Sequence, residues 1–217
     1  MVQTADVVVI GGGIAGLSVA ARMAAHARVV VLEGESAPGY HASGRSVAFA
    51  HYGLGETLVR TLTALSMTEL GAHGSLHPAL HIASAGEVAV LDELEEAHRQ
   101  FGCDYTRAGP QEARALLPVL RPEACYAALV DHGSLKLDTH AMLQTHVASL
   151  KAAGGALVTG ARVSAIARES VDWRVATTLE SDGAPAHAFG RYVCAHAYTP
   201  QAITRAANAG VRTIEHG

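Results

Sequence analysis

The sequence predicts an α/β fold built on a parallel β-sheet, and three segments near its start carry this prediction. Residues 7–10 are an unbroken run of branched apolar side chains, typical of a strand buried on both faces. Apolar residues then recur at helical spacing over 14–27, and residues 28–32, apolar after Arg28, are predicted to form a second buried strand. Strand, helix and strand in this order make a βαβ unit, so the two strands must be parallel.

The remaining elements are predicted from periodicity and from stop signals. Further helices are expected over 56–71, 91–101, 111–117 and 137–153. The last of these has Asp138 as its expected N-cap and Gly154 with Gly155 as its stop. Strands are expected after it, over 156–159, 162–167 and 173–179.

Composition indicates a packed chain and excludes one class of partner. The 217 residues are 49% hydrophobic and 17% charged, which is ample apolar material for a core. A formal net charge of −4 excludes the basic face that a phosphate backbone requires, and 5% aromatic residues are too few for a base-stacking platform. We therefore expect one domain with a lobe, and no nucleic-acid partner.

The cysteines and the first residues indicate a compartment. Cys103, Cys125 and Cys194 are an odd number without C-x-x-C spacing, which fits a reducing environment. Residues 1–6 lack a basic leader, and the apolar stretch after them contains glycines and reaches Arg22 too early to span a bilayer. The sequence predicts a cytoplasmic protein without a membrane span and leaves its oligomeric state open.

A glycine motif joins the first predicted strand to the first predicted helix. Gly11, Gly13 and Gly16 satisfy G-x-G-x-x-G. The first glycine permits the tight turn, the second lets a diphosphate approach the backbone, and the third lets helix and strand pack closely. The helix N-terminus offers free N–H groups and a partial positive charge to that diphosphate. The motif therefore predicts a dinucleotide-binding site.

Glu33 and the loop after it indicate which dinucleotide. Glu33 closes the second strand, where its carboxylate can accept both ribose hydroxyls of an adenosine. A nicotinamide protein normally continues here into another helix and strand. This chain has instead a loop rich in small residues, in which Ser43, Arg45 and Ser46 are candidate donors to phosphate or ribityl oxygens. The loop favours FAD and a Rossmann-like FAD-binding domain.

Three segments in combination match a known family: 8–16 (VVIGGGIAG), 29–33 (VVVLE) and 38–46 (PGYHASGRS). Residues 60–63, 77–78, 116–120 and 138–140 support the match. Over 6–179 the chain resembles the N-terminal part of the D-amino-acid oxidase superfamily of FAD-dependent oxidoreductases, and within it the D-arginine dehydrogenase-like members. The resemblance implies an FAD-binding domain, 1–50 and 137–190, interrupted by part of a smaller α+β substrate lobe, 51–136.

The resemblance also implies a cofactor, a substrate class and site residues. The cofactor would be FAD, and the substrate a small amine or D-amino acid. Tyr52 is similar to an active-site tyrosine over the flavin, and Glu87 is a candidate contact for a basic substrate side chain, with an exposed lobe glutamate as the alternative. The implied cofactor contacts are Gly11, Gly12, Gly13, Ile14, Ala15, Gly16, Glu33, His41, Ser43, Gly44, Arg45, Ser46 and the backbone of Val163 near the adenine.

The end of the chain departs from that family. Members continue to a further strand with an Asn-Ala-Ala-Gly-like turn and then to the second half of the lobe, and we expect both to be missing here. Residues 191–217 are similar to a fragment of the metal-dependent amidohydrolases, in which His196 and His216 would be ligands on successive barrel strands. Two histidines are too few for an open zinc site, so no metal is expected.

These observations predict an FAD-dependent oxidoreductase that oxidises the C–N bond of a D-amino acid or similar amine by hydride transfer to flavin. As a hypothesis, the chain is a truncated or inactive form, joined near residues 186–191 to the amidohydrolase-like tail. Two alternatives remain open: a non-catalytic module that binds NAD or ADP, and an amidohydrolase fragment. Whether the chain is an active enzyme is not decided by its sequence.

Overall fold

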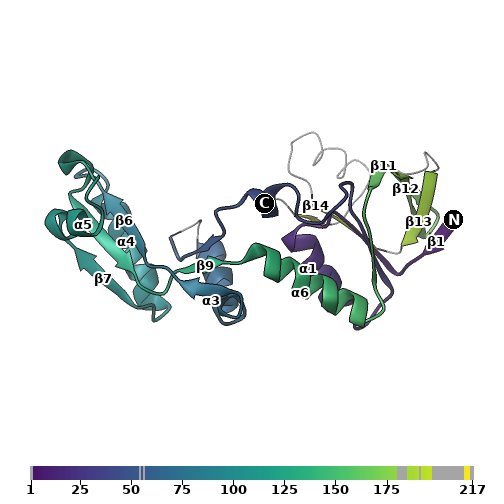
Figure 1. Cartoon of the computed structure of the whole chain (residues 1–217), viewed down its shortest axis with the longest axis horizontal. Helices are drawn as coiled ribbons and strands as arrows, with labels where there is room; N and C mark the ends of the chain where they lie inside the picture. The colour runs from purple at the N-terminus through teal and green to yellow at the C-terminus, as the bar shows by residue number, and fades with distance from the viewer. Residues whose placement is uncertain are drawn as a thin grey trace. The chain divides into compact units, whose positions relative to one another are not determined.

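The computed structural model of the chain describes residues 2–53, 55, 57–179, 185–190, 192–196 and 213–215. Two compact units make up the chain, and each is described by itself (Figure 1). The first, which we call the sheet unit, joins Met1–Ser46 to Thr139–Gly217. The second, which we call the lobe unit, is Val47–Asp138.

In its described residues the sheet unit contains two sheets and three helices. Its strands are β1 (Val2–Thr4), β2 (Val7–Ile10), β3 (Val29–Leu32), β10 (Ala156–Val158), β11 (Ala161–Glu169), β12 (Asp172–Leu179), β13 (Pro185–Gly190), β14 (Tyr192–His196) and β15 (Thr213–Glu215). Its helices are α1 (Ile14–Met23), α2 (Ala42–Arg45) and α6 (Thr139–Ala152). A parallel sheet has the order β10-β3-β2-β14-β15, and a second sheet has the order β1-β13-β12-β11. The predicted α/β fold with a parallel sheet is confirmed.

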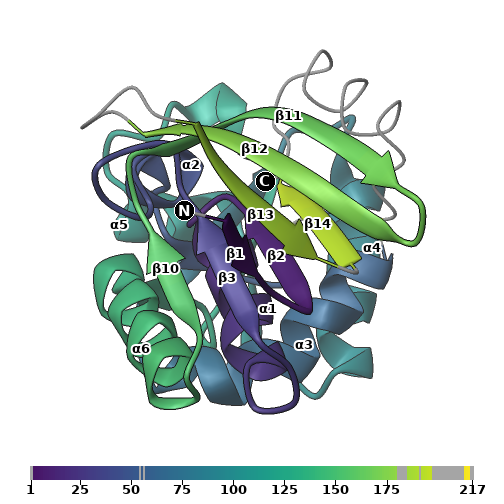
Figure 2. The ribbon, with the colours of Figure 1, turned by 90° about the vertical axis from the view of Figure 1, so that its right-hand side faces the viewer.

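The parallel sheet is covered on both faces, which explains why β2 and β3 are apolar throughout. Val7 and Val9 of β2 pack with Leu17 of α1 in a core that α6 also enters. Val8 points to the other face and packs with Val175 of β12 in a second core. Figure 2 shows β11, β12 and β13 crossing in front of the parallel strands, while α1 and α6 lie behind them. Each fully buried valine or leucine contributes roughly 1.5–3 kcal/mol to folding.

The ends of α6 show where the sequence prediction holds and where it fails. Gly154 has φ +82°, its N–H donates to Lys151 O, and the N–H of Gly155 donates to Leu150 O. These are the bonds of a Schellman motif, so the predicted stop is confirmed. The predicted start is two residues early, because Leu137 pairs with Gly74 in a strand of the lobe unit.

We expected residues 191–217 to form strands of an amidohydrolase-like fragment rather than to continue the first domain, but the first of these strands joins the parallel sheet. β14 pairs with β2 in parallel, with Val193 beside Val8 (Figure 2). β15 pairs with β14 and extends the same sheet. The apolar run Tyr192-Val193-Cys194-Ala195 explains this pairing, because a strand next to β2 must be apolar. Residues 192–196 of the tail are therefore a strand of the parallel sheet.

The lobe unit is an α+β unit of short antiparallel strands. Its strands are β4 (Phe49–Ala50), β5 (Gly74–Leu76), β6 (Ala79–Ala83), β7 (Tyr105–Ala108), β8 (Ala127–Asp131) and β9 (Leu135–Leu137). Its helices are α3 (Thr57–Gly71), α4 (Val88–Gln100), α5 (Pro110–Leu116) and the 3₁₀ turn η1 (Pro122–Ala124). The sheets have the orders β4-β9-β5 and β6-β8-β7. Leu91 and Leu94 of α4 pack on Leu129 of β8 and form one of its cores. Among the described residues, no helix has the length and hydropathy to cross a membrane.

Candidate dinucleotide-binding site

The turn between β2 and α1 is built from glycines that have no room for side chains. Gly11 has φ +105°, a conformation that L side chains rarely adopt, and its N–H donates to Leu32 O at 2.8 Å. A Cβ on Gly16 would lie 2.2 Å from Gly11 O. Helix α1 therefore starts directly against the end of the sheet, with its first N–H groups facing the turn. This is the geometry that the glycine motif predicts.

Glu33 is buried beneath this turn and its carboxylate is held by the backbone. Oε2 accepts the N–H of Gly12 at 2.6 Å, and Oε1 accepts the N–H of Glu35 at 2.9 Å. A Cβ on Gly12 would approach Oε2 to 3.0 Å, so only glycine leaves this contact unstrained. Each carboxylate oxygen has a second lone pair. The buried acid is thus fixed in place with acceptor capacity left for a pair of hydroxyls.

Ser43 caps α1 from the following loop. Its Oγ accepts the N–H of Ile14 at 2.9 Å, while Gly13 at the N-cap position has no side chain to do so. The N–H of Gly39 donates to Gly12 O at 3.0 Å, and a Cβ on Gly44 would lie 2.4 Å from Gly39 O. The loop and α2 are therefore packed tightly onto the glycine turn.

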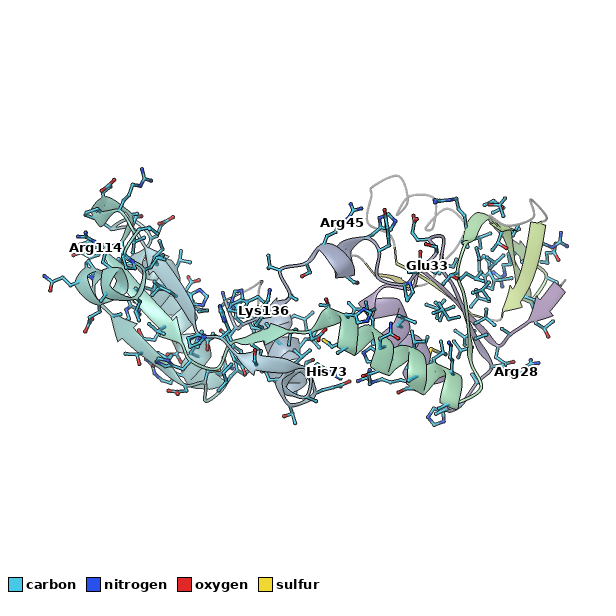
Figure 3. All side chains as sticks on the ribbon, in the orientation of Figure 1. Arg28, Glu33, Arg45, His73, Arg114 and Lys136 are labelled. Carbon is cyan, nitrogen blue, oxygen red and sulfur yellow. The ribbon has the colours of Figure 1, made fainter. Side chains whose placement is uncertain are left out.

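Charged side chains of this loop contact one another, a ring of the loop and a neighbouring strand. His41 Nε2 lies 2.9 Å from Glu35 Oε1, and Arg162 Nη2 of β11 lies 3.5 Å from the same oxygen. The Arg45 guanidinium lies over the Tyr40 ring at 5.6 Å. Figure 3 shows Arg45 on α2 and Glu33 at the end of β3. The side chains of His41 and Arg162 are 66% and 61% exposed and that of Glu35 is 24% exposed, so these ion pairs are weak and order the loop rather than stabilise the fold.

The structure also brings β11 to Glu33. The N–H of Ala161 donates to Glu33 O, and the N–H of Gly160 donates to Glu35 O, both at 2.8 Å. Val163 follows in β11, half-buried against the core beneath the sheet. The predicted residues Gly11–Gly16, Glu33, Ser43, Gly44 and Val163 are thus collected at one end of the sheet unit. The sequence analysis did not predict the contacts of Glu35, Gly39 and Arg162. Of these residues only Gly39 stands in a local pattern, since Pro38-Gly39 is a pair typical of turns.

FAD fits this donor set. The turn leaves no side chain between a ligand and the backbone, helix α1 presents its N-terminus, and Glu33 is a buried acid with free acceptor capacity. These are the groups that hold the diphosphate and ribose of a dinucleotide. The same groups recognise only the adenosine diphosphate half, which FAD, NAD and ADP share.

Tyr52 lies in the interior of the lobe unit. Its ring stacks on Phe101 at 6.2 Å and meets the edge of His98 at 5.6 Å. Burial, followed by the neighbouring Cys103 with which it shares a hydrogen bond, raises the pKa of Tyr52 to about 12. The phenol therefore stays protonated at neutral pH.

Glu87 is exposed and begins helix α4. Its Oε2 accepts the Oγ–H of Ser84 at 2.7 Å and the N–H of Ser84 at 3.2 Å. The hydroxyl bond and then the backbone bond lower the pKa of Glu87. The carboxylate thus closes the turn that precedes α4, and it makes no side-chain hydrogen bond to the helix itself.

A buried ionic network in the lobe unit was not predicted. His98 and Asp131 are both fully buried, with His98 Nε2 3.3 Å from Asp131 Oδ2. Oδ2 also accepts the hydroxyl of Ser134 at 2.7 Å, and Oδ1 accepts the N–H of Gly133 at 2.9 Å. Burial opposes charge on both groups, but these contacts outweigh it: the pKa of His98 is raised and the pKa of Asp131 is lowered. The pair favours an imidazolium facing a carboxylate.

The structure describes neither histidine side chain of the tail. His196 is in β14, where no side chain is described, and His216 lies outside the described residues. Within the described part of the chain, no group of three or more His, Cys, Asp or Glu side chains is arranged to hold a metal ion.

Comparison with known proteins identifies a family whose model matches most of this chain. The family model described as "DAO: FAD dependent oxidoreductase" matches residues 6–216. L-α-glycerophosphate oxidase from Mycoplasma pneumoniae with FAD bound is similar with a TM-score of 0.73 and 18% identity, over 88% of this chain and 53% of that one. Glycine oxidase from Geobacillus kaustophilus is similar with a TM-score of 0.73 and 18% identity, over 96% and 59%. L-proline dehydrogenase from P. horikoshii is similar with a TM-score of 0.71 and 21% identity, over 98% and 57%. The chain thus spans between half and three-fifths of the length of these structures.

Proposed function

The chain belongs to the DAO family of FAD-dependent oxidoreductases, and we propose that its sheet unit binds FAD across the glycine turn. One observation carries this proposal: the buried carboxylate of Glu33 is held 2.6 Å from the N–H of Gly12, directly under the turn. A buried carboxylate that keeps lone pairs after accepting two backbone N–H groups can use them for a ligand that donates hydrogen bonds. Recognition of ribose hydroxyls is such a use.

Within this proposal each part of the site has a separate task. The N–H groups at the start of α1 hold the diphosphate, and Ser43 orders that end of the helix. Glu33 takes the ribose hydroxyls, and the backbone around Val163 borders the adenine. His41, Gly44, Arg45 and Ser46 form the segment that continues along the cofactor, with His41 positioned through Glu35.

The reaction we propose is oxidation of a D-amino acid or similar amine. Bound FAD supplies a hydride acceptor, so that the C–N bond of the amine is oxidised to an imine, which water hydrolyses to an oxo acid and ammonia. The resemblance to D-arginine dehydrogenase-like members supports this substrate class, with Tyr52 and Glu87 as candidate contacts. In that resemblance further substrate contacts come from a part of the lobe that these 217 residues do not include. We therefore expect the 217-residue polypeptide to bind FAD with little or no turnover.

The test separates cofactor binding from turnover. The 217-residue polypeptide is titrated with FAD, NAD and ADP, and binding is followed by the thermal unfolding midpoint and, for FAD, by a shift of the flavin absorption band. The proposal expects FAD to raise the midpoint more than NAD or ADP does. Equal shifts with the three ligands would favour the non-catalytic nucleotide module instead. Anaerobic addition of D-arginine then reports turnover as bleaching of bound flavin, and rapid bleaching would contradict the expected lack of turnover.

We further propose that β14 belongs to the FAD-binding domain. Its pairing along β2 and the family match through residue 216 support this assignment. The alternative, an amidohydrolase fragment with His196 and His216 as metal ligands, predicts that Zn²⁺ raises the unfolding temperature and that a chelator lowers it. A midpoint that neither addition moves supports the assignment to the FAD-binding domain.

A further inference from the structure

A cavity of about 220 Å³ lies within the lobe unit, between α3, β6 and α4. Leu91 and Leu94 line its apolar side, and both are buried. Ile82 and Val90 line the same cavity but remain largely exposed, so they form its rim. The cavity is open to solvent on one side and therefore accessible to a small molecule.

Arg60 brings a positive charge to this cavity without a counter-ion. Its Nε is buried and makes no hydrogen bond. Within the part of the chain that the structure describes, no carboxylate lies within ion-pair distance of its guanidinium. A buried guanidinium N–H without an acceptor costs free energy, and a ligand that supplies the acceptor recovers it.

His81 is the second polar group in the wall, and it also has an unused nitrogen. Its Nε2 is buried without a hydrogen-bond partner. The ring is packed on Gly53, where a Cβ would lie 2.5 Å from His81 Cε1. Burial, with the neighbouring His51 next in weight, lowers the pKa of His81 to about 4. His81 is therefore neutral at pH 7 and adds a hydrogen-bonding nitrogen rather than a charge.

Two described acids near this cavity, Asp131 and Glu87, have partners other than Arg60. Asp131 is held by His98, Ser134 and the N–H of Gly133. Glu87 lines the cavity, but its Oε2 accepts both donors of Ser84. Among the described residues, neither acid pairs with Arg60, and Glu87 in the lining disfavours a ligand with two negative charges.

We propose that this cavity binds a small aliphatic monocarboxylate, with its carboxylate on Arg60 and His81 and its chain against Leu91 and Leu94. A guanidinium matches a carboxylate in geometry as well as in charge. Apolar walls with a few convergent polar groups are the usual form of a small-molecule site. The argument uses only the lobe unit and is independent of FAD.

The experiment titrates the full 217-residue polypeptide with sodium valerate by isothermal titration calorimetry. Pentylamine and 1-pentanol are matched probes, because they keep the chain and remove the negative charge. Arg60→Gln is the test variant, and Arg114→Gln, an exposed arginine on α5 of the same unit, is the control. We expect valerate to bind more tightly than either matched probe, Arg60→Gln to weaken it by about tenfold or more, and Arg114→Gln to leave it unchanged.

A second measurement uses the unmodified chain, so it does not depend on whether the Arg60→Gln variant folds. Methyl chemical shifts of the unmodified chain are followed by NMR during the valerate titration. The proposal expects the largest shifts at the methyl groups of Leu91 and Leu94. It is overturned if valerate does not bind, if 1-pentanol binds as tightly, if a folded Arg60→Gln binds valerate as the unmodified chain does, or if the shifted methyl groups lie elsewhere.

Discussion

The Glu33 carboxylate and the Gly12 N–H, 21 residues apart in sequence, form a 2.6 Å hydrogen bond that ties the end of β3 to the glycine turn. The bond is buried and its acceptor is a carboxylate oxygen, so it belongs to the stronger class of protein hydrogen bonds. It fixes the turn before any ligand arrives. Pre-organisation of this kind reduces the entropy that a dinucleotide loses on binding.

Replacing Glu33 with glutamine tests this bond and the proposed ribose contact together. The amide keeps one acceptor oxygen but loses the charge, so we expect the sheet unit to lose about 1.5–3 kcal/mol of stability. FAD affinity is expected to fall by about tenfold or more. Urea unfolding followed by the single tryptophan, Trp173 in β12, measures the first effect, and FAD titration measures the second. Glu93→Gln, at an exposed position of α4, is the matched control, and an equal loss in both variants would contradict the role of Glu33.

Gly16 tests the close approach of α1 to β2. Gly16→Ala places a Cβ 2.2 Å from Gly11 O, so the helix must move or the turn must distort. We expect a loss of about 3 kcal/mol in urea unfolding and loss of FAD binding. Gly71→Ala is the control, because no atom lies within 4 Å of its Cβ and alanine is the better helix former. If Gly16→Ala is as stable as Gly71→Ala, the turn is not as tightly packed as described.

The sheet unit was the more predictable part because its signals are local. The runs before Gly11 and Glu33 are apolar at every position, as strands covered on both faces must be. The spacing of Gly11, Gly13 and Gly16 then predicts the position of the turn. The position of Glu33 is predicted because it directly follows the second apolar run. β14 could also have been predicted from its apolar residues, but similarity to another family directed attention to His196 instead.

The lobe unit was less predictable because its strands are short and its contacts are distant in sequence. β5 and β9 have three residues each, too few to show an alternating pattern. β8 contains an apolar run that ends at Asp131, and nothing local indicates that this acid meets His98 of α4. A buried ion pair between separate elements has no sequence period, so only the tertiary structure reveals it.

The His98–Asp131 pair gives a prediction on stability. Asp131→Asn removes the charge that faces His98, and His98→Gln leaves a buried carboxylate without its partner, so each is expected to cost about 3–5 kcal/mol. The double variant should cost less than the sum, because each single change already removes the pair. Amide hydrogen exchange in α4 and β8 measures the effect within the lobe unit. Additive losses would show that the two groups do not interact.

The neutral state of His81 predicts how the lobe unit responds to acid. Its folded pKa, about 4, lies below its ordinary value of 6.5, so between these values the unfolded chain binds a proton that the folded chain does not. Stability must therefore fall as the pH drops from 6.5 to about 4, by roughly 3 kcal/mol from this residue. The lowered pKa of His51, which burial causes, acts in the same direction.

His81→Asn removes this titration and should flatten the pH dependence without abolishing it, because His51 remains. Amide hydrogen exchange in α4, corrected for the intrinsic exchange rate at each pH, measures the stability of the lobe unit from pH 6.5 to pH 4. His26→Asn, at an exposed position of the sheet unit, is the control. An unchanged pH profile in His81→Asn would mean that the folded pKa of His81 lies close to its ordinary value of 6.5, contrary to the burial described.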